Sequence, residues 1–118
     1  MDELGWQNEQ KAERALKATL HALRDRLVVT EAVQLAAQFP TLIRGMYYEN
    51  WRPTTTPVKE RKKLEFLAHV AACFNEGEDV DAEEIVRAVF TVLRMRVTKG
   101  EIDDIRHALP KEIRDLWD

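Results

Sequence analysis

The chain has 118 residues, of which 45% are hydrophobic and 33% are charged, and its formal net charge at pH 7 is −3. These values fit one globular domain and argue against a disordered chain. They also exclude a generally basic protein that coats phosphate groups. No apolar run approaches the roughly 20 residues that a membrane-spanning helix needs. Because the N-terminal residues also lack a signal-peptide pattern, we expect a cytoplasmic protein with no membrane partner.

The first predicted elements are three helices. Apolar residues spaced four, three and four apart predict a helix over residues 12–27, with one face made of Leu16, Leu20, Leu23 and Leu27. Thr30 is a suitable N-cap for a short helix over residues 31–39. Pro40 interrupts that helix and is well placed in the first turn of a third one.

A linker and a connecting helix follow. Residues 52–57 contain two prolines and are predicted to be a non-helical linker. Residues 58–74 are predicted to form a helix whose apolar face is Leu64, Leu67, Ala71 and Phe74. An acidic loop over residues 75–79 then leads to Asp81, which can cap the next helix together with Glu84.

The remaining elements repeat the first three. Shifting the chain by about 70 positions places residues 12–47 over residues 82–117 without a gap, and both the apolar pattern and several polar residues match. Gly100 takes the cap position and Pro110 matches Pro40. We therefore predict one all-α domain over residues 1–118, a helical bundle of two tandem three-helix copies plus the connecting helix. Arg24, Arg44 and Glu31 recur in the second copy, so we expect them to tie helix ends together through Arg–carboxylate bonds.

The shift also predicts an apolar groove. It places the first copy's counterpart of the connecting helix ahead of Met1, with Leu4 opposite Phe74. Either an earlier start of the chain or a second subunit would fill this groove. Since most soluble oligomers are symmetric homo-oligomers, we expect a homodimer or another protein partner.

Three segments carry a family resemblance. Residues 18–27, 42–53 and 100–110 resemble a bacterial family known as domain of unknown function 2267, and the similarity extends over essentially the whole chain. The resemblance implies a small helical bacterial protein. It implies no activity, and it supplies no catalytic residue.

The sequence contains no recognisable catalytic, cofactor or metal site. There is no serine, and Cys73, which cannot form an internal disulfide, lies in an apolar run and is expected to be a core residue. Glu65 and His69 can share a helix face, but the chain shows no metal-ligand spacing around them. The acidic segment before Val86 lacks the order of a calcium loop. We expect a protein that is not an enzyme.

One segment has the composition of an interface or ligand pocket. Tyr48, Trp51 and Arg52 break the internal repeat, and they combine rigid aromatic rings with a planar cation. His21 and Arg44 complete this candidate face. We expect binding or assembly, with small-ligand or anion binding at the same face as the alternative.

A less favoured alternative is association with nucleic acid. Basic residues next to an aromatic ring can pair with phosphates and stack on bases. Such residues follow Trp51 at Arg52, Lys59, Arg61, Lys62 and Lys63. Because they also fit the solvated face of a helix, nucleic acid is not expected to be the partner.

Overall fold

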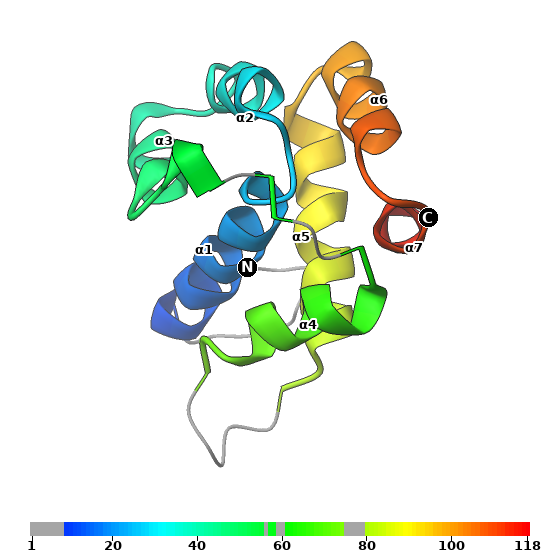
Figure 1. Cartoon of the computed structure of the whole chain (residues 1–118). Coiled ribbons are helices and arrows are strands. Elements are labelled where there is room, and N and C mark those ends of the chain that lie inside the picture. The colour runs from blue at the N-terminus through cyan, green and yellow to red at the C-terminus, as the bar shows by residue number, and fades with distance from the viewer. Residues whose placement is uncertain (1–8, 56, 59–60, 75–79) are drawn as a thin grey trace.

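Two long helices, α1 and α5, lie at the centre of the fold (Figure 1). The structure is a computed structural model that describes residues 9–55, 57–58, 61–74 and 80–118. Every regular element in these ranges is a helix, which confirms the all-α prediction. The elements in chain order are α1 (Glu9–Arg24), α2 (Val29–Ala36), α3 (Thr41–Tyr48), η2 (Pro53–Thr55), α4 (Lys63–Ala71), α5 (Ala82–Arg96), α6 (Lys99–Ala108), α7 (Lys111–Arg114) and η3 (Asp115–Trp117).

The other helices surround this central pair. Helix α4 packs on both α1 and α5, and it lies at the opposite end of the pair from α2 and α6, which contact each other (Figure 1). Helix α3 packs on α1, and the η3 turn packs on α5. Within the described ranges, no helix is long and apolar enough to cross a bilayer.

The amphipathic patterns of α1 and α5 produce the core. The buried stripe of α1 includes Leu20 and Leu23, and that of α5 includes Val86, Phe90 and Leu93. The Phe90 ring stacks on Trp117 with centroids 4.0 Å apart, which fixes η3 against α5. Of the four apolar residues predicted to form the face of the first helix, Leu16 is only partly buried, and Leu20, Leu23 and Leu27 are fully buried.

The predicted apolar face of α4 is wrong. Leu64 is 78% exposed and Ala71 is also exposed, whereas Phe66 and Val70 are fully buried. Of the other two predicted residues, Phe74 is buried and Leu67 is partly buried against the core. The run is apolar at nearly every position, so two helical faces fit the pattern equally well. Burying Phe66 together with Val70 removes more apolar surface from water than burying Leu64 together with Ala71.

The predicted starts of α2 and α6 are each two residues late. The N-cap of α2 is Val28 rather than Thr30, and its side chain makes no cap hydrogen bond. The N-cap of α6 is Thr98 rather than Gly100, and the Thr98 hydroxyl accepts from the Glu101 amide. At α5 the predicted N-cap is confirmed, since Asp81 accepts from the amides of Glu83 and Glu84, but the Glu84 side chain makes no bond back to Asp81 among the described residues.

The region between α3 and α5 also differs from the prediction. The linker expected to be non-helical contains a single 3-10 turn, η2, in which the Thr55 amide donates to the Arg52 carbonyl. Proline at the first helical position has no amide hydrogen that needs a partner, so it is compatible with this turn. Helix α4 is shorter than the predicted 58–74, and the acidic loop over residues 75–79 lies outside the described residues.

Two glutamates face each other where α2 meets α6. Glu31 lies in the first turn of α2 and Glu101 in the first turn of α6. One carboxylate oxygen of each residue is buried without a hydrogen-bond partner among the described residues. Burial, followed by the negative charges of Glu31 and Asp104, raises the pKa of Glu101 to about 6.

This pair makes stability depend on pH. The folded pKa of Glu101 lies above its ordinary value of 4.5, so its stabilising contribution is complete below pH 4.5 and is lost as the pH rises through 6. The difference corresponds to at most about 2 kcal/mol. The side chain of Glu101→Gln stays neutral at both pH values. We therefore expect the free energy of unfolding of this variant, relative to the wild type, to be larger at pH 7.5 than at pH 5. Urea unfolding followed by circular dichroism at both pH values measures this, with exposed Glu84→Gln as the control. Equal pH dependence in the wild type and Glu101→Gln would contradict the assignment.

Candidate functional site

The structure brings together two of the five predicted face residues. Tyr48 ends α3 and Trp51 follows it in the chain, and their ring centroids are 5.3 Å apart. Both side chains are partly buried against the core, and Arg52 beside them is exposed. The indole Nε1 of Trp51 is buried without a hydrogen-bond partner among the described residues. This segment therefore presents an aromatic pair and one exposed cation.

His21 instead holds the end of α3. Its Nε2 lies 2.6 Å from the carbonyl oxygen of Met46. A carbonyl can only accept a hydrogen bond, so Nε2 carries the proton. Burial is the main cause that lowers the pKa of His21, which keeps the ring neutral at pH 7. The imidazole thus satisfies one of the last carbonyls of α3, which have no partner within the helix.

Arg24 and Arg44 perform the same task at two helix ends. The Arg24 guanidinium donates to the carbonyls of Tyr47 at 2.6 Å and Glu49 at 2.9 Å. That of Arg44 donates to the carbonyls of Ala36 at 3.1 Å and Phe39 at 2.9 Å, at the end of α2. The expected tying of helix ends is thus present, but it runs mainly to main-chain carbonyls and not to carboxylates. Only Arg24 also pairs with a carboxylate, through Asp25 at 2.9 Å.

Equivalent bonds recur 70 positions later in the chain. Arg94 donates to the Trp117 carbonyl at 2.8 Å, as Arg24 does to Tyr47. Arg114 donates to the carbonyls of Arg106 at 2.9 Å and Leu109 at 3.0 Å, matching the two bonds of Arg44. Most of these arginines are therefore committed to holding the helices together.

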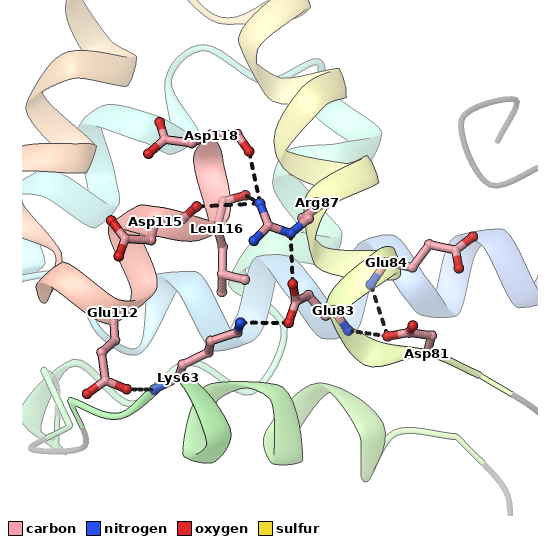
Figure 2. Close-up of polar contacts among 9 residues, drawn as sticks. All are labelled: Lys63, Asp81, Glu83, Glu84, Arg87, Glu112, Asp115, Leu116 and Asp118. Atoms are coloured by element: carbon pink, nitrogen blue, oxygen red, sulfur yellow. Dashed lines mark hydrogen bonds and ion pairs between the residues drawn. The ribbon is translucent and has the colours of Figure 1, made fainter.

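A polar network at the start of α5 was not anticipated from the sequence (Figure 2). Glu83 pairs with Lys63 at 2.7 Å and with Arg87 at 3.0 Å, and these two hydrogen bonds lower the pKa of Glu83. Arg87 also donates to the Asp118 carbonyl at 2.9 Å. The four-residue spacing of Glu83 and Arg87 was a signal available in the sequence. An open depression of about 570 Å³ lies beside this network, but its charged lining is already paired in part.

The same network engages part of the basic cluster. Lys63 pairs with Glu83, and Lys62 lies 3.8 Å from a carboxylate oxygen of Glu112. The main-chain amide of Lys63 donates to the other carboxylate oxygen of Glu112 (Figure 2). These carboxylates offset the positive charge that a nucleic acid would need to meet.

A smaller cavity of about 150 Å³ lies between α1 and α4. His21, Asp25, His69 and Cys73 are among the residues that line it. The expectation that Cys73 is a core residue is wrong, because its side chain is exposed and the thiol donates to the His69 carbonyl at 3.6 Å. Phe74 points inward in its place. No group of three or more His, Cys, Asp or Glu side chains in the described ranges could hold a metal ion.

Exposed large apolar side chains gather in the first half of the chain. Val28, Val29 and Val33 are 48%, 39% and 44% exposed, and Leu42 at the start of α3 is 77% exposed. Seventy positions later the residues are Thr98, Lys99, Asp103 and Glu112. Aligning the two segments for polarity, and not only for similarity, would have revealed this difference from the sequence.

The fold and its contacts define a small helical domain whose polar side chains mainly brace helix ends. The chain matches the model of the family described as "Uncharacterized conserved protein (DUF2267)" over residues 1–116. The chain therefore belongs to the DUF2267 family, as the sequence resemblance predicted. A search of curated proteins found no match.

The brace made by Arg24 can be tested against its counterpart. Arg24 is 3% exposed and Arg94 is exposed. Arg24→Ala leaves the carbonyls of Tyr47 and Glu49 without this donor, so we expect a loss of about 3 kcal/mol in the free energy of unfolding. For Arg94→Ala, which removes one bond near solvent, we expect a loss of about 1 kcal/mol or less. Urea denaturation of both variants measures the difference. Equal losses would mean that the burial of Arg24 does not increase its contribution to the free energy of unfolding.

Proposed function

We propose that this protein is a binding and assembly protein without catalytic activity that associates with itself. We further propose that it consists of two tandem copies of a three-helix unit, at residues 12–47 and 82–117, joined through α4. In this proposal the two copies share a scaffold, and the surface of the first copy makes the intermolecular contacts.

The repeated arginine bonds support the tandem arrangement. Arg24 and Arg94 donate to carbonyls at equivalent places, as do Arg44 and Arg114. Glu31 and Glu101 occupy matching positions, and they meet each other between α2 and α6. A polar residue that makes the same bond in both halves serves the fold, and so it is a poor candidate for chemistry.

The single observation that carries the proposed function is the difference between the two halves at exposed positions. Val29 and Val33 are exposed on α2, where α6 carries Lys99 and Asp103. Leu42 is exposed where α7 carries Glu112, which contacts the start of α4. Apolar side chains that gather at the surface are typical of interaction sites.

The oligomeric state tests this proposal. Native mass spectrometry of the purified chain, with analytical ultracentrifugation over a wide concentration range, should detect a dimer in equilibrium with the 13.7 kDa monomer. The reason is that association removes the exposed apolar surface of the first half from water. A bare monomer at every concentration would contradict self-association.

The alternative is a small-ligand or anion-binding module at Tyr48, Trp51 and Arg52. The observation in its favour is that exposed Arg52 directly follows Trp51, which forms a partly buried aromatic pair with Tyr48. Planar cations next to aromatic rings suit anionic or aromatic ligands.

A variant separates the two readings. Under the alternative, Arg52→Ala should abolish binding of a small anion such as inorganic phosphate, because it removes the charged donor. Isothermal titration calorimetry measures this, with the ion-paired Lys62→Ala as the control. Under the main proposal neither variant changes phosphate binding, and any effect of Arg52→Ala is confined to the monomer–dimer equilibrium.

A further inference from the structure

We propose that the contact between α2 and α6 is sensitive to pH: it is closed when the Glu31–Glu101 pair holds a proton, and it opens locally when both carboxyl groups are ionised. This contact is one of those that join the two halves of the chain. Its opening changes how the halves are held together without unfolding the central helices α1 and α5. The inference concerns a conformational device and does not depend on the proposed self-association.

The glutamate pair has no cation to neutralise it. Glu101 is only 8% exposed, and both it and Glu31 have a buried carboxylate oxygen that lacks a hydrogen-bond partner among the described residues. Neither glutamate forms an ion pair in those ranges, whereas Glu83 pairs with both Lys63 and Arg87. Burying an unpaired carboxylate is costly, and binding a proton is the simplest way to remove its charge.

The groups that face the pair are negative or neutral. Burial, together with the negative charges of Glu31 and of Asp104 on α6, raises the pKa of Glu101 to about 6. Tyr47 on α3 lies close enough to be affected by the charge of Glu101, and its hydroxyl donates to the Ala32 carbonyl at 2.8 Å. Burial raises the pKa of Tyr47 well above its ordinary value, so this hydroxyl stays neutral. None of these groups can replace the proton.

The cations nearest to the pair along the chain bond elsewhere. Lys99, two residues before Glu101, pairs with Asp103 at 3.2 Å. Arg94, near the end of α5, donates to the Trp117 carbonyl at 2.8 Å. The last residue of α5, Arg96, is exposed and bonds to neither glutamate. In His107, the ring nitrogen Nδ1 lies 2.7 Å from the Asp103 carbonyl oxygen, in the last turn of α6.

A second link between the same two elements does not change with pH. The side chain of Gln38, just after α2, donates to the Thr98 hydroxyl at 3.4 Å and accepts from the Thr98 amide at 3.2 Å. The equivalent positions in the other half are Ala108 and Val28, whose side chains cannot form such bonds. The link therefore exists once and holds α2 near α6 when the glutamates repel each other, so the opening stays local.

Helices α2 and α6 are placed where a local opening is possible. They lie at the opposite end of the central pair from α4, and α6 is the element that α2 contacts most (Figure 1). They have only 8 and 10 residues. Helices of this length depend on tertiary contacts for their stability. Segments with few such contacts open before the rest of a fold.

Hydrogen exchange followed by mass spectrometry at pH 5 and pH 7.5 tests the inference. After correction for the intrinsic exchange rate, the protection of the amides in α2 and α6 should fall by up to about eightfold between these pH values. The reason is that Glu101 has a pKa of about 6 in the closed contact and returns towards its ordinary 4.5 when the contact opens. Protection in α1 and α5 should stay constant.

Two substitutions should change this result in opposite ways. Glu101→Gln stays neutral, so the fall in protection should disappear. Glu31→Lys places a cation beside Glu101, so protection of α2 and α6 at pH 7.5 should exceed that of the wild type. The controls are Glu84→Gln on α5 and His107→Gln, which removes the imidazole of α6, and both should keep the wild-type fall. Circular dichroism checks that each variant is folded.

Three results would overturn the inference. The first is equal protection of α2 and α6 at the two pH values in the wild type. The second is an equal fall in α1 and α5, because the whole fold would then respond. The third is a fall that persists in Glu101→Gln. The proposed self-association is judged separately, by the oligomeric state of the wild type.

Discussion

The arrangement of the helices depends on how their last main-chain carbonyls are satisfied. The final carbonyls of a helix have no partner within it, and burying them unpaired is costly. Here side chains from neighbouring elements supply the donors. His21 and Arg24 on α1 hold the end of α3, and Arg44 on α3 holds the end of α2. Helices α2 and α3 are thereby fixed in place by bonds to a helix next to them.

The carboxyl pair between α2 and α6 lowers the stability of the fold at neutral pH, whereas the bonds to helix ends raise it. Glu31 and Glu101 meet in a place where the two negative charges repel each other, and burial favours a neutral group. The arginine bonds to main-chain carbonyls are independent of this pair, because they do not involve either glutamate.

The polar network around Glu83 shows how ion pairing limits the available chemistry at the start of α5. Lys63 and Arg87 are both paired with Glu83, and Arg87 also binds the chain terminus (Figure 2). Four of the exposed large apolar side chains, Val28, Val29, Val33 and Leu42, and the segment at Arg52 precede α4, whereas Leu64 and Met95 lie on α4 and α5. This unequal distribution is the main reason to assign binding to the first half.

The sequence by itself determined the helical class, the family and the position of most core residues. The reason is that the spacing of apolar residues in α1 and α5 is compatible with only one buried helix face, which includes Leu23 and Leu93. Local chemistry also located the ends of helices where a proline or a capping aspartate leaves one choice, as at Pro40, Asp81 and Pro110. The type and position of these residues were enough to predict where the helices begin.

Only the tertiary structure decided which face of α4 is buried and therefore that Cys73 is exposed. It also decided that His21 and Arg44 serve helix ends and leave the Tyr48–Arg52 segment without them. The physical reason is the same in both cases. Nearly uniform apolar runs and long polar side chains have several local solutions of similar free energy, and contacts with residues distant in the chain select one of them.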